Sequence, residues 1–414
     1  MSAEMSDGKK RGALDGIRII DLTSVVLGAY ATSLLGDMGA DIIKVESPSP
    51  KNGAGGDIMR WAGDTPSGER NGLGPIYMTI NRNKRSVLLD LKQDSAREAL
   101  LKLISTADVF AANIRYEGLK RLGLSYEDVR KVKPDIIYVI GTGYGEDGVY
   151  GGRPAYDDLI QAASGIASMA SEVDGDPRPR FFPTLVADKT TGLFMANAIL
   201  SALFHKERTG TGQFVEVPMM ESMVSFLLTE HLYGHTYEPP TGPIGYVRVT
   251  APDRKPYRTS DGYIAILPYS DKQWRDFFSL GGKPDLFETD IRFNTYENRT
   301  RNIRHLYAMV EDVTSLKSTE EWMTLLTNAD IPCARVNRLG DLMQDPHLQS
   351  VGLFEKRTHP VEGSYWSIRH PVTYGETPAS IRRDPPLLGE NTQEVFRELG
   401  LNDDEIEKLL PTNT

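Results

Sequence analysis

A single carboxylate stands at the head of a long apolar segment near the middle of this 414-residue chain. The carboxylate belongs to Asp188, and the apolar segment runs from Gly192 to Phe204, followed by a basic cluster, a glycine turn and the alternating segment Gln213–Val217. Aspartate is favoured as a helix N-cap, where it accepts hydrogen bonds from free backbone N–H groups. The same position could keep the carboxylate ionised through the helix dipole and surround it with donors for a developing oxyanion. The two interpretations are compatible, and the second makes Asp188 a candidate catalytic group.

The first 150 residues, which must help to position this group, alternate between strand and helix patterns. Short apolar strands are predicted at 17–22, 41–46, 109–112 and 136–140. Helices are predicted at 27–38, after an N-cap at Asp94 and after an N-cap at Ser125. Strands that alternate with helices favour a mostly parallel sheet covered on both faces. The expected fold class is therefore α/β, with a Rossmann-like open sheet.

The pattern changes from about Phe226, where proline and glycine interrupt the chain. A hairpin turn is predicted at 260–262. Helical patterns follow at 271–280, 303–315 and 319–329. A second, smaller domain is expected here, since a chain of this length exceeds one ordinary core.

The composition argues against several classes of protein. The 47 basic and 57 acidic residues give a formal charge of −10, which disfavours nucleic acid and an anionic membrane surface as partners. The single cysteine, Cys333, excludes an intrachain disulfide and suits a reducing compartment. No apolar stretch approaches the roughly 20 residues of a membrane span, and the first residues lack the apolar core of a secretory signal. A soluble, cytoplasmic enzyme is expected.

Two other kinds of site are suggested by single features of the sequence. A nicotinamide site is suggested by Glu46 at the end of the second strand. The turn after the first strand, however, reads TSVVLGAY and has one glycine in place of G-x-G-x-x-G. His231 and His235 have helical spacing but not the H-E-x-x-H pattern, and no third ligand is evident. Neither a dinucleotide site nor a metal site is predicted.

Six blocks of the sequence together resemble the family III CoA-transferases, the CaiB/BaiF family. The central block is VADKTTG…ILSALFHKERTGTGQFVEVPMMESM. The others are LDGIRIIDLTSVVLGAYATSLLGDMGADIIKVESP, NRNKRSVLLDLK, ADVFAANIRYEGLKRLGLSYEDVRKVKPDIIYVIGTGYGEDG, DPHLQSVGLFE and PLLGENTQEVFRELGL. They occur in the family's order, on either side of residues 226–344.

The resemblance implies an acyl-CoA:carboxylate CoA-transferase that takes a coenzyme A thioester as substrate and requires no metal or redox cofactor. Asp188 would attack the donor thioester, an aspartyl-CoA thioester would form, and a free carboxylic acid would then accept the CoA. A 2-methylacyl-CoA racemase of the same superfamily is the alternative, but Tyr156 stands where those enzymes have a histidine acid/base. The formyl-CoA branch is not expected, because nothing between Gly242 and Gly282 matches its glycine run.

The resemblance also implies eight further residues at the coenzyme A site: Val25, Lys84, Asn113, Ile114, Arg121, Tyr156, Asp157 and Met219. Val25 would contact the pantetheine through its backbone, and Lys84 and Arg121 would meet the phosphates. The pair Asn113–Ile114 would lie near the adenine, without the aromatic ring that the family has there. The last three residues would line the active site.

The implied architecture has three segments. Residues 1–225 would form the first part of a large Rossmann-like domain, 226–335 a smaller α+β domain, and 336–414 a return segment that completes the large domain. The family arrangement is an interlocked homodimer, in which each small domain touches the large domain of the partner.

Overall fold

The computed structural model describes residues 12–48, 55–69 and 71–410, and the chain divides into two compact units. The larger unit comprises the chain up to Ser164, Phe181–Phe226 and the segment from His347 onward. The smaller unit comprises Gly165–Arg180 and Leu227–Pro346. Its main segment lies close to the expected 226–335, whereas Gly165–Arg180 was expected in the large domain.

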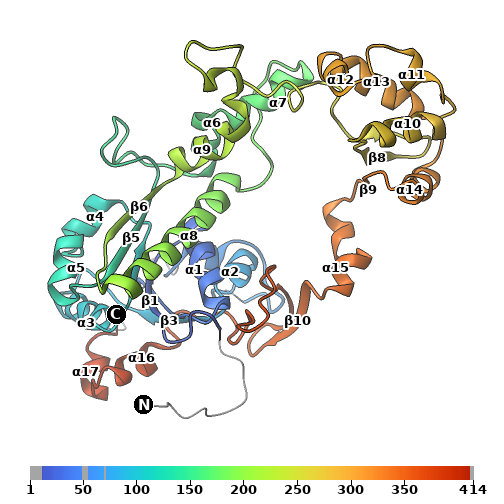
Figure 1. Ribbon diagram of the computed structural model, residues 1–414. Helices are drawn as coiled ribbons and strands as arrows, with labels where there is room; N and C mark the ends of the chain where they lie inside the picture. Colours follow the sequence, from blue (N-terminus) through green and yellow to red (C-terminus); the bar gives the residue numbers. More distant parts are fainter. Residues whose placement is uncertain (1–11, 49–54, 70, 411–414) are drawn as a thin grey trace. The chain divides into compact units, whose positions relative to one another are not determined.

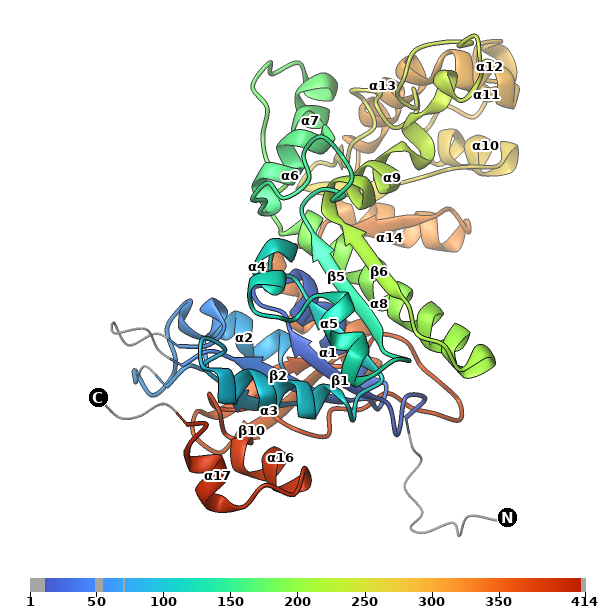
Figure 2. The same ribbon diagram turned by 90° about the vertical axis from the view of Figure 1, so that its left-hand side faces the viewer.

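A six-stranded parallel sheet forms the centre of the larger unit (Figure 2). Its strands are β1 (Arg18–Leu22), β2 (Asp41–Glu46), β3 (Lys84–Leu88), β4 (Val109–Ala112), β5 (Ile137–Thr142) and β6 (Phe214–Pro218). Their order in the sheet is β3-β2-β1-β4-β5-β6, and every neighbouring pair is parallel. This is the strand order of a Rossmann-like open sheet, so the predicted α/β class is confirmed. The four predicted strands lie within two residues of their expected bounds.

Helices cover both faces of this sheet (Figure 1). One face carries α1 (Leu27–Asp37) and α8 (Val186–Thr209), and the other carries α3 (Asp94–Ile104), α4 (Tyr116–Arg121) and α5 (Tyr126–Val132). Ser125 caps α5 as predicted, because its hydroxyl accepts from the Asp128 N–H. The predicted cap of α3 is wrong. Gln93 occupies the N-cap position, and Asp94 is the first helical residue, with its carboxylate paired to Arg97 one turn later.

The remaining elements of the larger unit are short. They are η1 (Ile58–Trp61), α2 (Pro75–Ile80), α6 (Asp157–Ser164), β10 (Phe354–His359), β11 (Gly363–Ile368), α16 (Thr392–Glu398) and α17 (Asp403–Glu407). Two further helices cross the boundaries between the units: α9 (Met219–His231) and α15 (Pro346–Ser350).

The last part of the chain closes the edge of the sheet at β3. The Ser86 N–H donates to Asn391 Oδ1 at 3.0 Å, and the Leu88 N–H donates to Thr392 Oγ1 at 3.0 Å. These side chains satisfy backbone donors that an edge strand would otherwise expose. The helical segment predicted after Leu387 is present as α16 and α17, which pack apolar side chains into the core.

The smaller unit has an antiparallel sheet of β7 (Tyr257–Arg258), β8 (Tyr263–Ile266) and β9 (Cys333–Arg335). The predicted turn joins β7 to β8, where the Thr259 N–H donates to the Gly262 carbonyl. Its helices are α7 (Ile166–Asp174), η2 (Tyr233–Thr236), α10 (Asp271–Leu280), α11 (Leu286–Thr289), α12 (Tyr296–Arg301), α13 (Ile303–Thr314), α14 (Thr319–Asn328) and η3 (Leu339–Gln344). Three of these match the predicted helices. In the described part of the chain, no helix combines the length and apolar character needed to cross a membrane.

Candidate functional site

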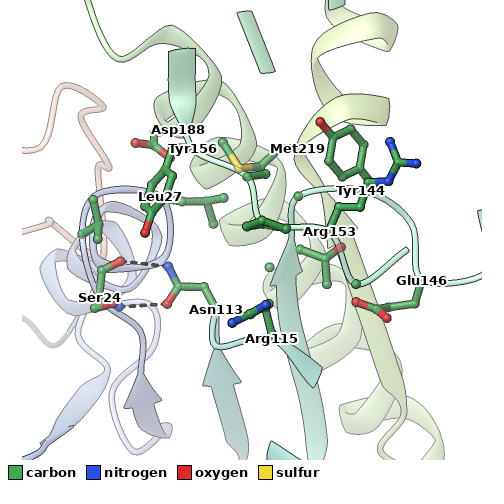
Figure 3. A pocket seen from close by; sticks show the side chains of 17 residues that line it. Ser24, Leu27, Asn113, Arg115, Tyr144, Glu146, Arg153, Tyr156, Asp188 and Met219 are labelled. Atoms are coloured by element: carbon green, nitrogen blue, oxygen red, sulfur yellow. Dashed lines mark hydrogen bonds between the residues drawn. The ribbon is translucent and has the colours of Figure 1, made fainter. Parts of the chain in front are cut away.

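A pocket of about 270 Å³ lies at the carboxyl ends of β1, β4 and β5 (Figure 3). The chain leaves β1 toward β2 and leaves β4 toward β5, in opposite directions along the sheet. Loops that diverge in this way open a crevice between two neighbouring strands, and open α/β sheets bind ligands there. The pocket therefore lies where the strand order predicts a binding site.

The turn between β1 and α1 forms one wall of the pocket. Asn113, at the end of β4, accepts from the Ser24 N–H at 2.9 Å and donates to the Ser24 carbonyl at 2.8 Å. Both bonds are visible in Figure 3. Val25 follows with a φ of 65°, which is rare for a β-branched residue. The wall is thus a fixed, unusual backbone turn.

Asp188 enters the pocket from the first turn of α8. The expectation that it is the N-cap is wrong, because the helix begins at Val186 and Leu185 is the N-cap. Asp188 is the third helical residue, and its own N–H donates to Asp157 Oδ1 at 3.0 Å. Gly192, one turn later, lets α8 approach α1 closely, since a β-carbon there would lie 2.7 Å from the Leu27 carbonyl oxygen.

A second carboxylate, that of Asp157, accepts from the backbone N–H of Asp188. Asp157 is the first residue of α6 and is 4% exposed. Besides the Asp188 N–H, it accepts from Gln161 Nε2 at 2.6 Å. Gln161 in turn accepts from the Phe182 N–H at 2.7 Å, in the loop that leads to α8. These bonds connect α6 to the start of α8 and hold the backbone at Asp188.

The environment of Asp188 favours the protonated form. Burial, and then the charge of Asp157, raise the pKa of Asp188 to about 7. The interpretation that the helix N-terminus keeps this carboxylate ionised is not supported, because burial and the neighbouring negative charge raise the pKa of Asp188. The ionised form that remains near neutral pH is poorly solvated, which suits a nucleophile.

The pocket brings together most of the residues that the sequence indicated. Its lining includes Val25, Asn113, Tyr156, Asp188 and Met219. Asp157 accepts from the Asp188 N–H, while Ile114 and Arg121 are exposed and lie outside the lining.

Lys84 is buried instead of facing the pocket. Its Nζ lies 3.0 Å from Asp21 Oδ2 and also donates to the Ala29 carbonyl. Although burial opposes ionisation, the ammonium groups of Lys84 and Lys44 lower the pKa of Asp21 to about 2. The Lys84 ammonium is therefore buried and paired within the larger unit, and it is not positioned to contact a phosphate of a ligand in this pocket.

Several residues of the site were not identified from the sequence. Ser24, Leu27, Arg115 and Arg153 line the pocket, and Gln161 donates a hydrogen bond to Asp157. Arg115 follows β4 by only three residues, and Gln161 is one helical turn after Asp157. Both positions could have been found from their spacing. Arg153 belongs to a long loop, where its side chain lies 4.4 Å from the centre of the Tyr150 ring, and no spacing rule identifies it.

Known proteins resemble this chain along almost its whole length. The family model described as CoA-transferase family III matches residues 14–392. Succinyl-CoA:glutarate CoA-transferase of Mus musculus is 32% identical over 410 residues and the match covers 98% of this chain and 91% of that protein. Succinyl-CoA:mesaconate CoA-transferase of Haloarcula marismortui is 32% identical over 398 residues, with coverages of 94% and 97%. The crystal structure of a CAIB/BAIF family protein from Brucella suis has a TM-score of 0.77 at 29% identity and covers 94% of this chain and 100% of its own.

Replacement of the second carboxylate tests the electrostatic part of this site. Asp157→Asn removes a negative charge beside Asp188 but leaves it buried, so we expect the pKa of Asp188 to fall only part of the way from about 7 toward its ordinary value of 3.8. Titration of ¹³C-labelled aspartate carboxyl groups by NMR measures this shift. Asp158→Asn, at an exposed position of the same helix, is the matched control. An unchanged Asp188 titration in Asp157→Asn would contradict the proposed coupling.

Proposed function

This chain is a member of CoA-transferase family III, and we propose that it moves coenzyme A between carboxylic acids through a covalent intermediate on Asp188. One observation carries the proposal. A carboxylate that is only 8% exposed stands at the start of α8, in a pocket with two arginines, and the backbone N–H of the same residue donates to a second carboxylate. A buried carboxylate with a raised pKa in a cleft is typical of a catalytic group.

The proposed reaction divides one transfer into steps that each exchange one bond. The Asp188 carboxylate attacks the thioester carbonyl of the donor, and CoA leaves as a thiolate, so that a mixed anhydride remains on the enzyme. The thiolate attacks the aspartyl carbonyl, releases the donor acid and forms an aspartyl-CoA thioester. The acceptor carboxylate attacks this thioester, which gives a second anhydride and CoA thiolate. Attack of the thiolate on the acceptor carbonyl forms the new acyl-CoA and frees Asp188.

The acid substrates proposed for assay are short dicarboxylic acids. Two similar proteins are named for succinyl-CoA together with glutarate or mesaconate, all of which are dicarboxylate compounds. Arg115 and Arg153 line the pocket, and their positive charges suit an acyl-CoA that carries both phosphates and a second carboxylate. We propose that coenzyme A enters as the substrate thioester and that the reaction needs no other cofactor. We also propose that the enzyme is cytoplasmic.

Asp188 can be tested as the nucleophile by trapping. Incubation with an acyl-CoA and hydroxylamine should convert the Asp188 side chain into a hydroxamate, which mass spectrometry of peptides detects. Asp188→Asn should reduce transfer by at least about a thousandfold, since it removes the attacking group, while Asp158→Asn should retain it. Near-normal transfer by the folded Asp188→Asn protein would exclude a covalent role for this residue.

The phosphates of coenzyme A provide a second test. Arg115→Gln should weaken CoA binding by roughly tenfold, because charge-assisted contacts contribute about 1.5–3 kcal/mol. Arg121, at the exposed end of α4, remains a predicted phosphate contact, so Arg121→Gln should show a loss of CoA affinity that disappears with dephospho-CoA.

Lys84→Met should instead lower the thermal midpoint and leave the CoA affinity of the folded protein nearly unchanged, because the Lys84 ammonium is paired with Asp21. A large loss of affinity in stable Lys84→Met would restore the original prediction.

We also propose that the working unit is a homodimer. Supporting this, α8 is apolar on opposite sides: Met195 and Ile199 are buried, whereas Leu193, Phe194 and Phe204 are 53%, 42% and 64% exposed. A helix of this kind is usually covered on its second side by another protein surface.

The mass in solution tests the dimer. Sedimentation of the purified chain at micromolar concentration should give twice its mass of 46.0 kDa. Leu193→Asp should shift the protein toward the monomer, because it places a charge in the proposed interface. Ser95→Asp, on the opposite face of the sheet, introduces the same charge and should not. An active monomer at every concentration would contradict the proposal.

A further inference from the structure

The turn at the pocket holds a conformation that its sequence does not favour. Val25 has a β-branched side chain and a φ of 65°, in a region that costs non-glycine residues free energy. Such a conformation persists only where neighbouring groups enforce it, and it is enriched at functional sites. Asn113 fixes the preceding residue, Ser24, but makes no bond to the Val25 peptide in the contacts described above.

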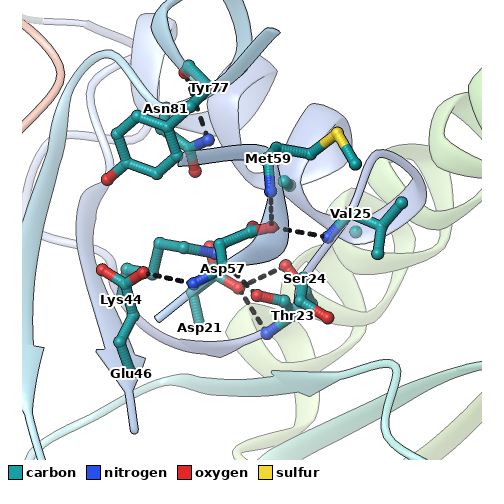
Figure 4. A network of polar contacts seen from close by, with 12 residues as sticks. Asp21, Thr23, Ser24, Val25, Lys44, Glu46, Asp57, Met59, Tyr77 and Asn81 are labelled. Atoms are coloured by element: carbon teal, nitrogen blue, oxygen red, sulfur yellow. Dashed lines mark hydrogen bonds and ion pairs between the residues drawn. The ribbon is translucent and has the colours of Figure 1, made fainter. Parts of the chain in front are cut away.

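Asp57 supplies the bond to the Val25 peptide. Its carboxylate is 2% exposed, and Oδ1 accepts from the Val25 N–H at 3.1 Å (Figure 4). The same oxygen accepts from the Met59 N–H at 3.0 Å and caps η1. Capping η1 needs only the bond from Met59. The bond from Val25 joins residues 32 positions apart and connects Asp57 to the wall of the pocket.

Lys44 completes the arrangement from β2. Its buried ammonium lies 3.1 Å from Asp57 Oδ2 and donates to the Thr23 carbonyl at 2.6 Å. Burial acts against this charge, but the carboxylates of Asp57, Asp21 and Glu46 together raise the pKa of Lys44. The ion pair therefore binds both peptide groups that flank Ser24. Lys44 donates to the Thr23 carbonyl, and Asp57 accepts from the Val25 N–H. Asp57 is itself anchored, since its N–H donates to Glu46 Oε1 at 2.9 Å.

We propose that Asp57 is a positioning residue of the CoA site, which with Lys44 holds Val25 in its left-handed conformation and so shapes the wall that accepts the thioester end of coenzyme A. The proposal rests on the proposed function. Asp57 does not line the pocket itself and acts through the turn. Its effect should therefore depend on whether residue 25 needs to be held in place.

A double-mutant cycle tests this dependence. Glycine adopts positive φ without a penalty, so Val25→Gly should make the turn independent of the Asp57 bond. Asp57→Ala should weaken binding of free CoA, measured by calorimetry, by about tenfold in the chain that retains Val25. In the Val25→Gly background the same change should cost less than about threefold. Equal losses in both backgrounds would overturn the proposal, because a general structural role predicts no dependence on residue 25.

Asp57→Asn separates the hydrogen bond to Val25 from the ion pair with Lys44. It can replace Asp57→Ala if that variant does not fold. The amide oxygen can still accept from Val25, whereas Lys44 loses its ionic partner. CoA affinity should stay within about threefold of the unaltered protein, although the thermal midpoint should fall. A tenfold loss of affinity in Asp57→Asn that persists in the Val25→Gly background would overturn the positioning role.

The binding measurement also separates this proposal from the proposed function. If the unaltered protein binds CoA but transfers none to any acid, CoA transfer is wrong, and the cycle still decides the role of Asp57. If transfer occurs but the cycle shows equal losses, only the role of Asp57 is wrong. If the unaltered protein does not bind CoA, both are wrong.

Discussion

A charge that is removed from water must be paired within the protein, and the carboxylate of Asp21 imposes this condition on the centre of the larger unit. Asp21 is fully buried at the end of β1, where Lys84 of β3 pairs with it and Thr23 and Thr32 donate to it. These partners tie β1 to β3 and to α1. Lys44 extends the network to Asp57, and so to the turn at the pocket. Paired buried charges thus contact the backbone of the turn that forms one wall of the pocket.

The same principle separates two kinds of buried carboxylate in this protein. Asp21 has lysine neighbours, and its pKa is lowered to about 2 despite burial. Asp188 is buried beside Asp157, and its pKa is raised to about 7. The first carboxylate is stable as an anion and serves the fold. The second gains or loses a proton near neutral pH, which is the property expected of a group that takes part in chemistry.

The described part of the C-terminal segment supports the strands next to this site, and none of its residues lines the pocket. Asn391 and Thr392 satisfy the backbone donors of β3, and Arg60, which pairs with Glu46, donates to the Pro386 carbonyl. The charged network beneath the pocket is therefore completed by residues that lie more than 300 positions later in the chain. Contacts of this range attach the returning segment, from His347 onward, to the rest of the larger unit.

The sequence by itself determined the α/β class, most strand and helix positions and the candidate group Asp188, because apolar periodicity and capping are local properties of neighbouring residues. It also indicated Val25, Asn113, Tyr156 and Met219 through resemblance to a family. Only the tertiary structure decided that Lys84 is buried against Asp21, and that Asp157 faces Asp188 and changes its pKa. Burial and charge pairing depend on residues distant in the chain. No local pattern in the sequence states which of them will meet.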